Sequence, residues 1–193
     1  MEQNFWQKNK VLIIVLVVVV LLASWVVGKY NFFVNQNENI TGQWAQIENQ
    51  LQRRYDLIPN VINTVKGITK QEKEVFSQLA EARTRYAGST TIDQKATAAG
   101  QVESSLARLL VIAENYPELK SSQSFRDLTV ELEGTENRIA VERMKYNDLV
   151  KNLNANVKTF PNSILASIFG VAERSYFEIT EGTEVVPKVD FSE

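Results

Sequence analysis

The side chains in this sequence best suited to chemistry are carboxylates. A charged band in the C-terminal half combines four glutamates with two arginines: Glu131, Glu133, Glu136, Glu142, Arg138 and Arg143. The spacing of the surrounding apolar residues places Glu72 and Glu142 on apolar helix faces. Two inward-facing carboxylates could hold a metal ion or exchange protons, which makes a carboxylate–metal enzyme the most distant of the functional alternatives. More commonly such a carboxylate pairs with an arginine or a tyrosine hydroxyl and fixes helix register, so we expect no catalytic residue, metal or cofactor.

Composition excludes several classes of function. The 193-residue chain contains no histidine and no cysteine, which excludes Cys/His pairs, Ser-His-Asp triads, disulfides and the usual zinc and haem ligands. Its glycines never form a phosphate-binding GxGxxG or GxxxxGK[ST] pattern, and no serine begins an SxxK motif. With a formal net charge of −2, the chain also lacks the electrostatic attraction that nucleic acid binding requires.

An uncharged apolar run occupies residues 11–27 and is long enough to cross the hydrocarbon core of a membrane. We therefore predict a single-pass anchor over residues 11–28, preceded by a short N-terminal segment, residues 1–10. A cleaved signal peptide with a cut near Gly28 is the alternative. Lys8 and the other positive charges before the run favour an N-terminus inside, with the bulk of the chain outside the cytoplasm.

Heptad spacing dominates the rest of the chain. From Trp44 to Tyr86 apolar residues recur every seven positions, and the register runs through Pro59. Because a loop would have no reason to preserve the phase, we interpret residues 44–86 as one helix with a kink at Pro59. The alternative is two helices, the second capped by Asp56 with the proline in its first turn.

The remaining helices complete an all-α fold. We predict a helix over residues 93–115 that Thr91 or Asp93 caps, a long heptad helix from Phe125 to Phe160, and a short helix over 162–170. Such seams pack helices at about 20° in a left-handed bundle. The predicted organisation is an N-terminal transmembrane helix followed by one bundle of long helices over residues 29–170 and an acidic, extended tail over residues 171–193.

Several separated motifs resemble those of the LemA family. They are WAQIENQLQRRYDLIPN from Trp44, ENYPELK from Glu114, TENRIA from Thr135, the pair Tyr146-Asn147, and FPN from Phe160. They occur in the family's order, and the resemblance covers about residues 30–178. It implies a bacterial single-pass membrane protein whose soluble part is an antiparallel bundle of long helices. It supplies no catalytic residues.

The resemblance and the heptad pattern together single out nine polar positions: Arg53, Arg54, Asp56, Glu136, Asn137, Arg138, Glu142, Arg143 and Asn147. They could form an internal network that sets helix register, or a surface that a partner reads. For Arg54 we expect burial and a pair with a carboxylate of another helix.

The function expected from these features is that of a structural or interaction protein of the bacterial envelope, held in the cytoplasmic (inner) membrane. Its partners would be the membrane and either a second copy of the chain or another protein. The alternative is a sensor or adaptor that binds a partner protein through the bundle or the tail. In that case the segment from Glu184 to Phe191 would add to the partner as an extended strand.

Overall fold

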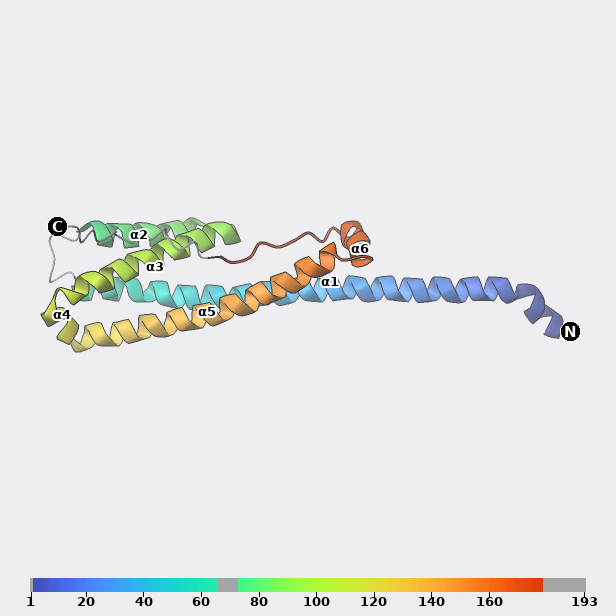
Figure 1. Ribbon diagram of the computed structural model, residues 1–193, viewed down its shortest axis with the longest axis horizontal. Helices are drawn as coiled ribbons and strands as arrows, with labels where there is room; N and C mark the ends of the chain where they lie inside the picture. Colours follow the sequence, from blue (N-terminus) through green and yellow to red (C-terminus); the bar gives the residue numbers. More distant parts are fainter. Residues whose placement is uncertain (1, 66–72, 179–193) are drawn as a thin grey trace, which may run out of the picture. The chain divides into compact units, whose positions relative to one another are not determined.

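The computed structural model describes residues 2–65 and 73–178, in which the chain forms six helices and no strand (Figure 1). The helices are α1 (Glu2–Val65), α2 (Lys73–Gly88), α3 (Ile92–Glu114), α4 (Pro117–Ser121), α5 (Gln123–Lys158) and α6 (Asn162–Phe169). The predicted all-α class is confirmed. Residues 171–178 follow α6 without regular secondary structure.

The chain divides into two compact units. The anchor unit comprises Met1–Gly42 with Asp148–Arg174, and the bundle unit comprises Gln43–Asn147 with the chain from Ser175 onward. Both α1 and α5 contribute a segment to each unit, because each of these helices continues through the boundary.

α1 contains a candidate membrane span near its N-terminus, by length and composition. The apolar side chains of this stretch are exposed, with Val11 at 75% and Leu21 at 64%. In water such a surface would be unfavourable by about 25 cal/mol for each Å² of apolar area, whereas lipid removes that cost. The helix continues from this stretch to Val65 without interruption and has Pro59 in its interior.

The prediction of one helix over residues 44–86 is correct through Pro59 but wrong beyond Val65, where α1 ends. The rings of Tyr55 and Tyr86 lie 4.4 Å apart, whereas one continuous helix would separate these residues by about 46 Å. α2 therefore runs back along α1. The intervening residues 66–72, which include Glu72, lie outside the described residues, and a bend at Pro59 remains a prediction.

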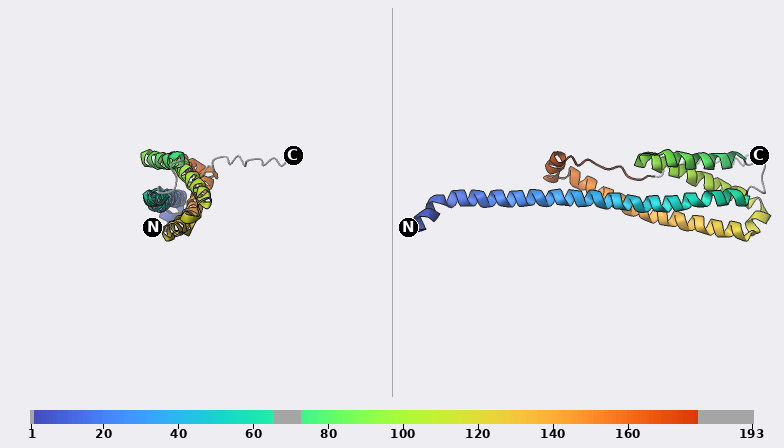
Figure 2. Two further views of the ribbon diagram at one scale, coloured as in Figure 1. Left: turned by 90° about the vertical axis from the view of Figure 1, so that its left-hand side faces the viewer. Right: turned by 180° about the vertical axis from the view of Figure 1, so that it is seen from behind.

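The bundle unit is antiparallel in both of its long pairings. Contacts from Gln43 and Arg53 on α1 reach Glu142 and Glu131 on α5, so the α5 number falls as the α1 number rises. α2 and α3 lie side by side (Figures 1 and 2), and they are antiparallel because Gln78 contacts Arg108 whereas Arg85 contacts Gln101. The core of this unit is apolar and almost fully buried, and its largest members include Ile47, Ile58, Leu79, Leu106, Leu109, Ile139 and Tyr146.

The ends of α3 have identifiable causes. Thr91 and Gln94 form a capping box, in which the Thr91 hydroxyl accepts from the Gln94 N–H at 3.2 Å and the Gln94 side chain accepts from the Thr91 N–H. Asn115 caps the other end, and Pro117 opens the five-residue α4 at its first turn, where no donor is needed. The predicted helix over 93–115 is thus found within one residue at each end.

The anchor unit packs α6 against α1 and α5. Its buried apolar side chains are Phe33, Ile40, Val150, Leu153, Leu165 and Ala166. α6 ends because Gly170 adopts φ +70°, a left-handed conformation that a side chain disfavours, and this lets the Val171 N–H donate to the Ala166 carbonyl at 2.9 Å.

Candidate functional site

α5 carries two apolar stripes within the bundle unit, one buried and one exposed. The buried stripe contains the predicted heptad residues Phe125, Leu132, Ile139 and Tyr146. A second set repeats with the same alternation of four and three residues on an open face, and we call it the α5 stripe: Val130, Gly134, Asn137, Val141 and Met144.

The α5 stripe is accessible along its length. The exposed fractions are 68% for Val130, 45% for Val141 and 60% for Met144. A methyl group added at Gly134 would meet no atom within 4 Å, so another backbone could approach there. Spacing of this kind is typical of a helix that packs against a second helix through a narrow seam.

The paired arginines of α1 meet two glutamates of α5 in different environments. Arg54 is only 8% exposed and forms an ion pair with Glu136, whereas Arg53 and Glu131 form an exposed pair at 2.9 Å. The expected burial of Arg54 against a carboxylate of another helix is therefore what the structure shows. A buried charge that loses its partner is strongly unfavourable, and a shift of α1 along α5 would separate Arg54 from Glu136. This ion pair therefore favours a single alignment of α1 with α5.

Glu142 also joins α1 to α5. Its carboxylate accepts from the Gln43 side-chain nitrogen at 2.6 Å and from the Lys145 ammonium at 2.9 Å. The hydrogen bond from Lys145 first, and then that from Gln43, lower the pKa of the Glu142 carboxyl. Glu142 is thus held as an anion in a structural contact, and its lowered pKa makes it unsuited to act as a proton donor.

The segment after α6 is bound back onto the bundle at a site that we call the tail dock, made of Trp44, Tyr146 and Asn147. Phe177 enters it fully buried, with its ring 5.3 Å from that of Trp44, and Trp44 in turn lies 5.6 Å from Tyr146. The Tyr146 hydroxyl donates to the Ser175 carbonyl at 3.2 Å. The contacts are edge-to-face aromatic pairs, which add to the gain from burial.

Asparagine side chains hold the main chain of this segment. In the bundle unit the Asn147 amide donates to the Phe177 carbonyl at 3.1 Å and accepts from its N–H at 2.9 Å. In the anchor unit Asn154 makes the same two bonds to Arg174, both at 2.9 Å. Asn147 was among the nine predicted positions, whereas Asn154 and Phe177 were not. The seven-residue interval between the two asparagines is the one signal in the sequence that could have indicated Asn154.

The other selected residues are not gathered at one place. Asp56 is exposed and accepts from the Gln52 side chain at 2.8 Å. Asn137 and Arg138 are exposed on α5, and Arg143 is half-buried. Among the described residues, no group of three or more acidic side chains converges in a way that could hold a metal ion.

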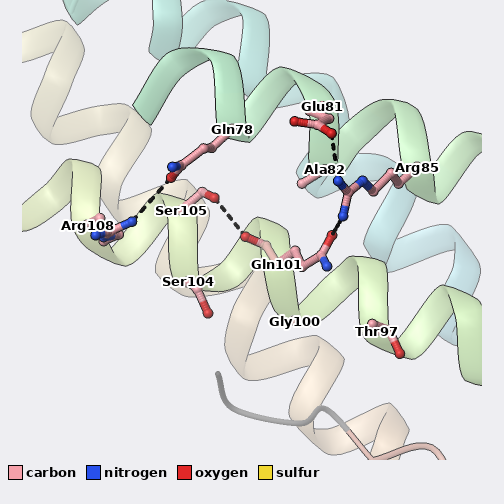
Figure 3. Close-up of a pocket in the computed structure, with 10 residues that line it drawn as sticks. All are labelled: Gln78, Glu81, Ala82, Arg85, Thr97, Gly100, Gln101, Ser104, Ser105 and Arg108. Carbon is pink, nitrogen blue, oxygen red and sulfur yellow. Dashed lines mark hydrogen bonds and ion pairs between the residues drawn. The ribbon is translucent and has the colours of Figure 1, made fainter. Parts of the chain in front are cut away.

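A groove of about 440 Å³ lies between α2 and α3 (Figure 3). Two hydrogen bonds cross it: Arg108 donates to Gln78 at 3.2 Å, and Arg85 donates to Gln101 at 3.3 Å. Arg85 also pairs with Glu81, one turn away on α2, at 2.6 Å. Because these side chains already form hydrogen bonds with one another, we interpret the groove as a polar contact between two helices. It does not indicate a ligand-binding site.

The rings of Tyr55 and Tyr86 pack against each other between α1 and α2, tilted by 57°. Burial raises the pKa of Tyr86 to about 12, with a smaller contribution from the Glu48 carboxylate. Burial, and to a lesser degree Tyr86, raises the pKa of Tyr55 far above its ordinary value. Within the described part of the chain, the Tyr55 hydroxyl has no hydrogen-bond partner.

Comparison with known proteins gives a family match and a small set of relatives. A model of the LemA family matches residues 43–191. The magnetosome proteins MamQ 1 and MamQ 2 of Paramagnetospirillum magneticum are each 27% identical to the chain, over 88% of its length and 72% of theirs. Protein LemA of Metamycoplasma hominis is 23% identical, over 86% of this chain and 76% of its own length.

Proposed function

This chain belongs to the LemA family, and from that premise we propose that it is a membrane-anchored scaffold of the bacterial envelope that associates with further copies of itself through the α5 stripe. Its character as a membrane-associated helical protein rests on the family and the apolar start of α1. The self-association is the further step, and one observation carries it: a second heptad seam is left open on a helix whose first seam is filled.

The stripe has the chemistry of a helix–helix contact. Val130 and Val141 supply branched apolar side chains, Gly134 allows close approach, and Asn137 lies between them. A single polar residue in such a seam typically fixes the register and the number of helices at some loss of stability. The stripe spans about 21 Å at 1.5 Å per residue, which is a short seam and therefore a weak one by itself.

The membrane anchor compensates for the weakness of this short helix–helix seam. Copies held in one membrane move in two dimensions, so the local concentration of each seam for the next is raised without any additional contact. We therefore expect an association that is clear in membranes or detergent micelles and weaker for a fragment that lacks the first 28 residues.

Light scattering of the detergent-extracted, full-length protein tests this proposal. The wild type is expected to form an oligomer, and the double variant Val130→Glu/Val141→Glu to be monomeric. Val111→Glu is the matched control, because Val111 is 64% exposed but lies on α3, outside the stripe. A monomeric wild type at every concentration, or equal disruption by the control, would overturn the proposal.

Cross-linking gives an independent readout. Because the natural chain has no cysteine, Asn137→Cys introduces a single thiol at the centre of the stripe, and Val111→Cys introduces one elsewhere. Mild oxidation of membranes is expected to yield a covalent dimer from the first variant and far less from the second. Labelling Asn137→Cys with an impermeant maleimide in spheroplasts also tests our proposal that the bundle lies outside the cytoplasm.

An adaptor that binds a partner through the tail dock is the second candidate. The tail dock binds the N–H, the carbonyl and the aromatic ring of one residue. An extended peptide from another protein could therefore occupy it in place of Phe177. A Phe-containing peptide that displaced the segment and changed Trp44 fluorescence would favour this candidate. The earlier expectation about Glu184 to Phe191 concerns residues outside those described.

A further inference from the structure

α6 lies in a stretch of sequence that is unusual for a chain with 23% charged residues. Residues 159–172 contain no charge, and the charges at the two ends of this stretch, Lys158 and Glu173, pair with each other at 2.7 Å. The loop into α6, the helix itself and its cap are therefore free of the lysines and glutamates that keep the other surface helices of this chain in water.

The helix has one face inside the anchor unit and one outside it. Leu165 and Ala166 are buried at 8% and 1% exposure. On the other face Ile164 and Ile168 are exposed at 54% and 69%, and Phe160, in the loop before α6, is exposed at 78%. Ile164 and Ile168 are four residues apart and so lie one turn above the other on one side of α6.

The position of α6 along α1 relates this face to the membrane. The Phe169 ring packs edge-on against Tyr30 at 5.3 Å and lies 6.4 Å from Phe33. Tyr30 is three residues beyond Val27, the last residue of the apolar run, or about 4.5 Å along the helix axis. The polar interfacial layer on each side of the hydrocarbon core is about 5–7 Å thick, so this height falls within it.

We propose that the α6 foot, made of the exposed side chains Ile164 and Ile168 with Phe160 in the loop before the helix, inserts into the interfacial layer of the same bilayer that α1 crosses. Helices that bind a membrane by themselves need basic residues for attraction and a long apolar face for affinity. α6 needs neither, because α1 already holds it at the surface. The foot would fix the tilt and rotation of the anchor unit, which a single span alone does not determine. This inference rests on the proposed anchoring.

The experiment again uses the absence of cysteine from the chain. Three full-length variants each carry one thiol labelled with an environment-sensitive fluorophore: Ile168→Cys on the foot, Leu16→Cys in the span, and Val111→Cys on α3. Val111 is the matched control, since its 64% exposure is close to the 69% of Ile168 and it lies outside the α5 stripe. The proteins are reconstituted in vesicles that contain lipids with a nitroxide quencher at a shallow or a deep acyl position.

The expected result is a distinct depth for each label. Emission from position 168 should be quenched several-fold more strongly than emission from position 111, and more by the shallow than by the deep quencher. Emission from position 16 should respond most to the deep quencher.

Quenching at position 16 but not at 168, with water-like emission at 168, would overturn the foot and leave the anchor intact. A label at position 168 that is shielded from water yet insensitive to lipid quenchers would place another protein copy on this face. That result would also overturn the proposed insertion of the foot into the membrane. If position 16 is not quenched either, the anchoring fails and the foot with it.

Discussion

Asn147 holds Phe177 through both polar atoms of its side-chain amide, with Nδ2 3.1 Å from the Phe177 carbonyl oxygen and Oδ1 2.9 Å from its backbone nitrogen. The two residues are thirty positions apart in the chain. An amide is the one neutral side-chain group that can donate and accept in this paired manner, and so it imitates a neighbouring β-strand. Both main-chain polar groups of Phe177 therefore have hydrogen-bond partners although this residue belongs to no sheet.

Replacing Asn147 by alanine should loosen this segment. Two hydrogen bonds are lost, at about 1 kcal/mol each, and the Phe177 N–H and carbonyl lose their partner. We expect faster proteolysis after α6 and a loss of about 1–2 kcal/mol in the free energy of unfolding in urea. Asn152→Ala, an exposed asparagine of the same helix, is the control. An equal effect of both substitutions would mean that the amide contact contributes nothing of its own.

Phe177→Ala should be detected by Trp44. The Phe177 ring covers one side of the indole at 5.3 Å, and its loss admits water, so Trp44 emission should shift to longer wavelength. The tryptophans at positions 6 and 25 are first replaced by phenylalanine, so that Trp44 alone emits. Removing a buried phenylalanine should also cost about 3 kcal/mol, the low end for such a change, since the segment can undock. Tyr176→Ala, which removes an exposed neighbour, should leave the emission unchanged.

The two arginine–glutamate pairs provide a matched comparison. Glu136→Gln should lower the free energy of unfolding by about 2–3 kcal/mol, somewhat less than a fully buried pair because the Glu136 side chain is 29% exposed. Glu131→Gln removes the same charge from an exposed pair and should cost about 0–1 kcal/mol. Urea denaturation of both variants measures the difference. If Glu131→Gln proved as costly as Glu136→Gln, burial of Arg54 could not be the cause.

Stability should fall at alkaline pH because of Tyr86 and Tyr55. An unfolded tyrosine ionises near pH 10, whereas burial raises the pKa of Tyr86 to about 12. Above about pH 10 the unfolded state therefore binds fewer protons than the native state, and the free energy of unfolding decreases as pH rises through this window. Tyr86→Phe should flatten the decrease between pH 10 and 12 in urea titrations. A decrease of unchanged slope in this variant would assign it to other groups.

Periodicity predicted most of the helices, and its failures have physical causes. The break between Val65 and Lys73 was missed because seven residues separate the two helices, which is one heptad and leaves the phase of the pattern unchanged. The five-residue α4 was missed because it is shorter than two turns and cannot establish a period. By contrast, Thr91 and Gly170 act through local backbone chemistry, and the helix boundaries next to them were predicted closely.

The candidate sites were less accessible from sequence. Arg54 could be assigned a carboxylate partner because it falls on a helix face with apolar neighbours and must be neutralised there. The tail dock could not be predicted, because Asn147 binds main-chain atoms, which no residue type reveals. The exposed stripe and the foot were also missed, since only the packed structure tells which apolar residues remain uncovered.

The way the tail dock is built bears on how this protein can change through evolution. From Ala172 to Glu178 only Phe177 buries its side chain, and the hydrogen bonds of Asn147 go to groups that every amino acid except proline possesses. Most positions of the segment can therefore drift freely while its attachment is preserved. Selection would act on the two asparagines that hold the main chain, on Phe177 and the residues of the tail dock, and on the length of chain between them. Homologous chains are thus expected to diverge quickly around an aromatic residue that stays in place.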